Sequence, residues 1–168
     1  MKLALLERYI NLVTDQDKHH VADQVWKMLV QSYSKIGGFK SAASSIELIA
    51  KAGLWKLVRR DSKIVAGMLY KDAYGRKAIA AFSDGTNTGK TDLFKLIQDD
   101  MKLDRAWGEV SGKMEELFTK FGGEPIPNRF AAILTGKHID ELDPDGIHYT
   151  RIINGTPVRK IIIGKPKH

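Results

Sequence analysis

The stretch DGTNTGKTD, residues 84–92, has the composition of a phosphate-binding loop. The nucleotide-binding P-loop needs a glycine, four residues and then Gly-Lys-Ser/Thr, so that consecutive amides curl round the phosphates. Only three residues separate Gly85 from Gly89 here, which changes the curl, so the run does not match the P-loop pattern. What remains is a glycine-rich turn between the apolar run 78–82 and a helical pattern, where free amides can meet an anion. The alternative is an ordinary strand-to-helix turn capped by Thr91.

The histidines raise a second kind of chemistry, metal binding. His19 and Asp23 have the spacing of two ligands on one helix face. The neighbouring His20 points to a different side, and no other grouping of His, Asp and Glu has metal spacing. We therefore expect a helix-surface pair and no metal.

Composition narrows the class of protein. The chain has 168 residues, and 43% of them are hydrophobic, which suffices for one domain with a core. It contains no cysteine, which excludes disulfides and thiolate metal sites. No apolar stretch has membrane-spanning length, and the charges in MKLALLERYI come too early for a secretory signal, so we expect a soluble, cytoplasmic protein. The formal charge of +7 lies mainly in the N-terminal third, which is compatible with a phosphate-bearing cofactor, a nucleic acid or an acidic partner.

Hydrophobic periodicity and turn residues predict the elements that must position these groups. A capping box at Thr14-Asp15-Gln16-Asp17 begins the first helix, and Asn154-Gly155 is a strong hairpin signal. The predicted elements are strand 9–13, helix 16–36, helix 41–52, strands 54–60, 63–71 and 76–83, a helix after the glycine-rich loop, strand 105–110, a helix ending at Gly122-Gly123, helix 128–137 and a hairpin over 146–164.

These elements follow the order β-α-α-β-β-β-α-β-α-β-β, which indicates an α/β fold. The segment 76–110 makes a βαβ crossover, whereas the strands before and after it form a meander and a hairpin. We expect a mixed, mostly antiparallel central sheet with helices on both faces, within a single domain over residues 1–168.

This order resembles the GCN5-related N-acetyltransferase (GNAT) superfamily over nearly the whole chain. INLVTDQDKHHVADQVWKML resembles the first strand and helix of that fold, and GEVSGKMEELFTKFGG resembles its fifth strand and fourth helix. The resemblance implies a divergent member that transfers an acetyl group from acetyl-CoA to an amine. The amine could belong to a small molecule, a protein or an aminoacyl-tRNA, and the basic balance somewhat favours the last.

The resemblance also assigns the glycine-rich loop. In the superfamily, backbone amides after the fourth strand hold the pyrophosphate of acetyl-CoA, in a pattern Arg/Gln-x-x-Gly-x-Gly/Ala. Aligning Gly89 with its central glycine places Thr86 at the Arg/Gln position, and Lys90 could add a point charge. The following helix is expected to begin near Thr91. The residues expected to bind the cofactor are Phe82, Ser83, Thr86, Asn87, Thr88, Gly89, Lys90 and Thr91.

Proton transfer is where the chain departs from the superfamily. Phe118 stands where the resemblance implies the tyrosine that protonates the leaving thiolate, and Ser111 stands where asparagine is frequent. The carbonyl partner would come from the end of the strand AIAAFS. The candidates for catalysis are Tyr149, Glu109 and Ser111, with Tyr149 the first replacement for the missing acid if it faces the cofactor. Strand alternation places His148 and Tyr149 on opposite faces.

These departures leave a second interpretation open. A protein can keep the fold, lose catalysis and serve as a binding or structural module for a protein or a nucleic acid, as in small phage-type proteins. Phe118, Ser111 and Thr86 favour that interpretation.

Overall fold

The computed structural model divides the chain into two compact units, and each is described by itself. The first unit comprises Met1–Asp72 and Ala78–Ile97, and the second comprises Ala73–Lys77 and Gln98–His168. The single domain expected from the sequence stays a prediction. The structure describes residues 9–34, 39, 42–72, 76–100, 106–110, 112–125, 150–153 and 156–162.

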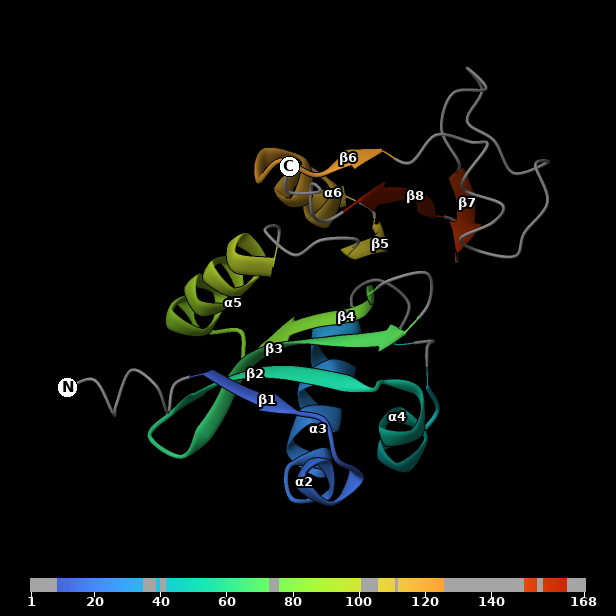
Figure 1. The fold of residues 1–168 in the computed structure, drawn as a ribbon. Coiled ribbons are helices and arrows are strands. Elements are labelled where there is room, and N and C mark those ends of the chain that lie inside the picture. Colours follow the sequence, from blue (N-terminus) through green and yellow to red (C-terminus); the bar gives the residue numbers. More distant parts are fainter. Residues whose placement is uncertain are drawn as a thin grey trace, which may run out of the picture. The chain divides into compact units, whose positions relative to one another are not determined.

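The sheet of the first unit contains four strands in the order β1-β2-β3-β4 (Figure 1). β1 pairs antiparallel with β2, and β2 pairs antiparallel with β3. The meander predicted between residues 54 and 83 is confirmed, because β-rich runs separated by short turns specify neighbouring strands. Its strands are β1 (Tyr9–Leu12), β2 (Leu54–Arg60), β3 (Lys63–Asp72) and β4 (Arg76–Ser83).

The helices of the first unit differ from the prediction in their boundaries. The single helix expected over 16–36 is two helices that meet at His20 and Val21. Thr14 caps the first of them as predicted, since its hydroxyl accepts the Asp17 amide at 3.2 Å. The helices are α2 (Asp15–His19), α3 (Ala22–Tyr33), α4 (Ser45–Lys51) and α5 (Asn87–Asp100).

α4 begins four residues later than predicted. Ser44 caps it by accepting the Glu47 amide at 3.2 Å, and the Glu47 carboxylate accepts the amide of Ala43 at 2.9 Å. These bonds satisfy amides that have no partner within the helix, so the boundary falls at Ser44.

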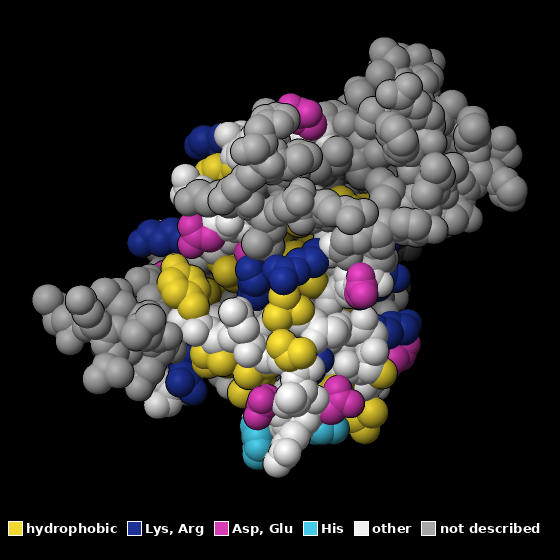
Figure 2. All heavy atoms as spheres, in the orientation of Figure 1, with side chains coloured by type: hydrophobic (Ala, Val, Ile, Leu, Met, Phe, Trp, Pro, Cys, Tyr) yellow, Lys and Arg dark blue, Asp and Glu magenta, His cyan; other side chains and the backbone are white. Residues whose placement is uncertain are grey.

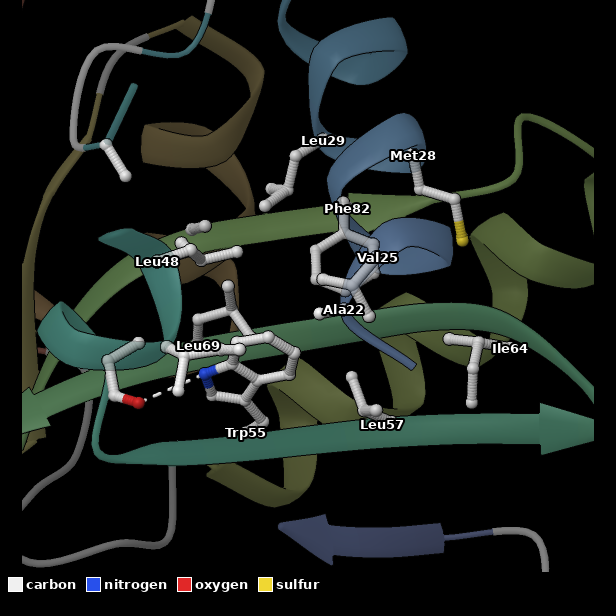
Figure 3. Packing of buried hydrophobic residues seen from close by; sticks show 14 residues of the cluster. Ala22, Val25, Met28, Leu29, Leu48, Trp55, Leu57, Ile64, Leu69 and Phe82 are labelled. Atoms are coloured by element: carbon white, nitrogen blue, oxygen red, sulfur yellow. Dashed lines mark hydrogen bonds between the residues drawn. The ribbon is translucent and has the colours of Figure 1, made fainter. Parts of the chain in front are cut away.

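The core of the first unit lies between α3, α4 and one face of the sheet. Side chains of Val25 and Leu29 from α3 meet Trp55, Leu57 and Phe82 from the strands (Figure 3). Trp55 is fully buried, and its indole N–H donates to the backbone oxygen of Ala52 at 3.0 Å. This bond satisfies the only polar group of the indole.

The opposite face of this sheet is also apolar. Val58, Ala66 and Met68 are buried but lie outside the core cluster, as expected for residues that alternate with Leu57 and Leu69. The buried residues of α5, which are Leu93, Leu96 and Ile97, are likewise outside that cluster. We therefore place α5 on the face opposite α3 and α4.

The register between β2 and β3 shifts in the middle of the pair. Val58 pairs with Ala66, but Arg59 pairs with Ile64, so Val65 is an extra residue in β3. Such a bulge turns backbone groups out of the ladder. The oxygen of Val65 accepts the amide of Asp84 at 2.8 Å, which ties the end of β4 to β3 at the start of the glycine-rich loop.

Gly67 of β3 has no room for a side chain. A Cβ there would lie 2.6 Å from Phe82 Cζ, 2.8 Å from Leu57 Cδ2 and 3.0 Å from the backbone oxygen of Lys56. We expect Gly67→Ala to lower the free energy of unfolding by about 1–3 kcal/mol, because buried neighbours must leave their rotamers. Urea unfolding measures the change.

Gly53 provides the matched control. A Cβ at Gly53 would meet nothing within 4 Å, and its φ is not in the left-handed region. The same Gly→Ala change there should leave stability equal or raise it by up to about 1 kcal/mol through the unfolded chain. Equal losses in both variants would contradict the packing at Gly67.

The described part of the second unit contains four strands and the helix α6. Its strands lie in the order β5-β8-β6, and β7 pairs with β8. Ile153 pairs with Thr156, which confirms the hairpin expected about Asn154-Gly155. The short strand β6 was not predicted, and the helix expected over 128–137 lies outside the described residues. The elements are β5 (Ala106–Val110), α6 (Gly112–Lys120), β6 (Glu124–Pro125), β7 (Thr150–Ile153) and β8 (Thr156–Ile162).

α6 ends where the sequence predicts. Gly122 has a φ of +99°, and the amide of Gly123 donates to the oxygen of Phe118 at 2.8 Å. A glycine in the left-handed region closes the last turn without strain. Within the part of the chain that the structure describes, no helix is both long enough and apolar enough to pass through a bilayer.

Candidate cofactor-binding loop and the edge of β4

The glycine-rich loop is shorter than the sequence suggests, because α5 begins at Asn87 and not near Thr91. Thr86 is the residue that caps the helix, since its Oγ1 accepts the amide of Gly89 at 3.0 Å. Thr91 lies in the second turn, and its hydroxyl donates to the backbone oxygen of Asn87 at 2.9 Å. The expected cap at Thr91 is therefore wrong, and TNTGKT is mostly helix.

Asp84 organises the segment before the helix. Its Oδ1 accepts the amide of Thr86 at 3.0 Å and the hydroxyl of Thr86 at 2.6 Å. One carboxylate thus orients the hydroxyl that caps the helix, and its negative charge lies near the positive end of the helix dipole. Gly85 follows with a φ of +83°, a conformation that favours glycine.

Gly89 is required by packing. A Cβ at this position would lie 2.1 Å from Asp84 Oδ1 and 3.0 Å from the backbone oxygen of Val65. The first turn of α5 therefore lies directly against the carboxylate and the bulge of β3. Only a residue without a side chain permits this approach.

Most amides of the loop already have acceptors. Those of Gly85 and Thr86 donate to side chains, and those of Gly89 and Lys90 donate to Thr86. Among the described residues, nothing accepts the amides of Asn87 and Thr88, which are the first two of α5, and both residues are exposed. These two amides are the groups that can bind an anion.

The side chains around these amides differ in their accessibility. Lys90 and Thr91 are exposed, so the Lys90 ammonium can approach an anion at the helix terminus. Phe82 is 1% exposed and belongs to the core. Ser83 is half-buried, and its backbone oxygen accepts the hydroxyl of Ser32 at 3.2 Å.

The side of β4 that faces away from β3 holds a second polar arrangement, which no local sequence pattern predicts. The amide of Ala81 donates to the phenol oxygen of Tyr33 at 3.1 Å, which joins the end of α3 to β4. Tyr33 ends α3, and its ring meets Phe39 edge-to-face at 5.3 Å. Burial raises the pKa of Tyr33 above its ordinary value of about 10, and the bond from Ala81 opposes part of that rise.

The chain was compared with known sequences and with solved structures. Neither a protein-family model nor a curated protein sequence matches the chain. Solved structures do match it. The ribosomal-protein-S18-alanine N-acetyltransferase of Escherichia coli is 11% identical with a TM-score of 0.55, over 95% of this chain and 96% of that one. The aminoglycoside 6′-N-acetyltransferase of Enterococcus faecium is 11% identical with a TM-score of 0.55, over 94% of this chain and 99% of that one.

The chain has the GNAT fold. An acyl-CoA N-acyltransferase of Pseudomonas aeruginosa, 9% identical with a TM-score of 0.50, matches 91% of this chain and 96% of its own length. The expected α/β class, with a mixed and mostly antiparallel sheet and helices on both faces, is confirmed. In this fold the glycine-rich loop follows β4 and precedes α5, which is the position that the sequence resemblance assigned to it.

The structure does not describe the side chains of the residues expected to transfer protons, so their roles stay predictions. Glu109 lies in β5 of the second unit, where it pairs with Lys160 of β8, and its side chain is not described. Ser111, His148 and Tyr149 lie outside the described residues.

Two further expectations can be placed in the GNAT fold. Phe118, which the sequence resemblance places at the position of the tyrosine, is 1% exposed and is a core side chain. The pair His19 and Asp23 belongs to two helices, α2 and α3. Among the described residues, no three His, Cys, Asp or Glu side chains gather at a metal-binding distance.

Proposed function

We propose that the protein is an acetyl-CoA-dependent N-acetyltransferase that acts on an amine. The observation that carries the proposal is the pair of open amides, Asn87 and Thr88, which follow β4 at the N-terminus of α5. The fold supports it, since the E. coli and E. faecium structures with this fold are N-acetyltransferases by name. The acceptor amine belongs to a small molecule, a protein or an aminoacyl-tRNA.

The residues of the loop fit the pyrophosphate of a coenzyme A. Two amides at a helix N-terminus supply donors and a positive dipole, and the exposed Lys90 adds a full charge. Asp84 opposes the ligand electrostatically, but its carboxylate is engaged by Thr86. Bound acetyl-CoA would supply an activated acetyl group. Tyr149, Glu109 and Ser111 are proposed to assist proton transfer, with Tyr149 as the donor to the leaving thiolate.

The second candidate is a GNAT-fold module without catalysis. Its support is Phe118, whose buried ring cannot donate a proton in place of tyrosine. Such a module would bind a protein or a nucleic acid. On the face in view in Figure 2, Lys and Arg side chains are interspersed with acidic and hydrophobic ones. Nucleic-acid binding would therefore depend on phosphate contacts and weaken steeply with salt.

A titration with acetyl-CoA tests the proposed function. A ligand that binds only the native state at 100 times its Kd raises the free energy of unfolding by about 2.7 kcal/mol. For a chain of this length, that corresponds to a rise in Tm of roughly 5–11 °C. Release of CoA thiol with a panel of amines then identifies the acceptor class.

Adenosine 3′,5′-bisphosphate is the control ligand, because it carries phosphates but no pantetheine arm or acetyl group. A rise in Tm with acetyl-CoA and not with the control supports the proposal. Absence of any rise with acetyl-CoA at millimolar concentration refutes it and leaves the second candidate.

A further inference from the structure

The phenol of Tyr33 lies on the side of β4 that faces away from β3. The amide of Asp84 donates to Val65 of β3, and the polar groups of a strand alternate between its two edges. The amide of Ala81 and the oxygen of Ser83 therefore point away from β3. Side chains at the end of α3 bond to both of them, namely Tyr33 to the amide and Ser32 to the oxygen.

The two hydroxyl groups differ in whether their proton is already used in a hydrogen bond. Ser32 uses its only proton to donate to Ser83, at 3.2 Å. Tyr33 accepts from Ala81 at 3.1 Å, and no described residue accepts its own hydroxyl proton. Tyr33 is half-buried as a whole residue. A hydroxyl that receives a backbone N–H and has an unused proton is polarised toward donating that proton. Because its pKa is raised, the group stays a phenol at neutral pH and keeps this proton.

We propose that the Tyr33 hydroxyl donates a hydrogen bond to the carbonyl oxygen of the bound acyl thioester, which makes it a catalytic residue of the reaction. The inference rests on the proposed function. Ala81 then acts through the phenol, in a relay from backbone N–H to phenol O–H to carbonyl oxygen.

The relay stabilises the charge that develops during acyl transfer. The neutral amine attacks the carbonyl carbon, a C–N bond forms, and the carbonyl oxygen becomes an oxyanion held by Tyr33. Collapse of this intermediate breaks the C–S bond, and the proton lost by the amine nitrogen balances the thiolate as a thiol. Tyr33 keeps its own proton throughout, so the role is separate from that proposed for Tyr149.

Binding of acetyl-CoA and of CoA to Tyr33→Phe tests the proposal. The variant keeps the ring that packs on Phe39 and removes the hydroxyl. We expect acetyl-CoA to bind about threefold to tenfold more weakly than to the wild type, as one hydrogen bond is lost, with little change for CoA, which has no acyl carbonyl. Turnover should fall by about 100-fold, the effect of removing an oxyanion donor.

Ser32→Ala is the matched control, because it also removes one bond between the end of α3 and β4. We expect it to change the ratio of the two affinities and the turnover by less than about twofold. Equal weakening of acetyl-CoA and CoA by Tyr33→Phe, or equal losses in both variants, would overturn the proposal and leave acetyl transfer standing. Absence of acetyl-CoA binding by the wild type would remove the proposed function and this inference together.

If Tyr33→Phe does not fold, a measurement on the wild type tests whether the thioester carbonyl accepts a hydrogen bond. Infrared spectroscopy with acetyl-CoA labelled with ¹³C at the thioester carbonyl reports the bond directly. A hydrogen bond to this oxygen lowers its stretching frequency on binding, and an unshifted band would exclude the donor.

Discussion

Thr88→Asp is expected to weaken the binding of acetyl-CoA by about 100-fold or more and to leave the protein at least as stable. Thr88 is the second residue of α5, it is exposed, and its amide is one of the two open donors. A carboxylate there occupies the place of the pyrophosphate and repels it. The same charge favours the N-terminus of the helix by about 0.3–1 kcal/mol. Calorimetry measures the affinity, and thermal unfolding measures the stability.

Gln98→Glu controls for net charge. This exposed residue adds the same single negative charge to α5, ten positions further along and thus about 15 Å away, which exceeds the Debye length at physiological salt. It should leave the affinity within about twofold of the wild type. If Thr88→Asp binds acetyl-CoA as the wild type does, the pyrophosphate does not lie at this helix terminus.

Arg60→Met is expected to lower the free energy of unfolding by about 3 kcal/mol, the largest loss of stability that we predict. The guanidinium at the end of β2 makes two bonds to the Asp92 carboxylate of α5, at 2.5 and 2.9 Å. Asp92 is fully buried, whereas Arg60 is 39% exposed, so removal of the arginine withdraws the counter-ion from the buried group. Tm should fall by roughly 6–12 °C.

Arg59→Met is the matched control for this loss. Arg59 precedes it in β2 and is exposed, and the described residues give it no ion pair. The same substitution there should change the free energy of unfolding by less than about 0.5 kcal/mol. Similar losses in both variants would show that an Arg→Met substitution destabilises β2 at either position. The ion pair with Asp92 would then contribute no stability of its own.

Local signals predicted most strands of the fold. Residues 54–83 alternate between apolar runs and short polar turns, and Asn154-Gly155 marks a hairpin, so strand pairing followed from neighbouring residues alone. The break between α2 and α3 was missed, since no glycine or proline marks it in the sequence. A tertiary contact fixes α2 there, because the ammonium of the buried Lys18 donates to the backbone oxygen of Gly53 at 2.9 Å.

The site was predicted in position but not in detail. TNTGKT offers Thr86, Thr88 and Thr91 as caps, and propensity alone does not choose among them. Asp84 determines that Thr86 is the cap, because its carboxylate orients the hydroxyl of Thr86. Tyr33 could not be found from the sequence, since its contact with Ala81 joins residues that are 48 positions apart.

The hydrogen bonds within the loop also define a signature for recognising it elsewhere. Asp84 orients Thr86, Thr86 caps the amide of Gly89, and Gly89 leaves space for Asp84, so the three side-chain types depend on one another. The residues between them contribute backbone groups only. A search for Asp-x-Thr-x-x-Gly after a β-strand would therefore retrieve distant chains that build this turn, including those in which the usual Arg/Gln-x-x-Gly-x-Gly/Ala pattern is absent.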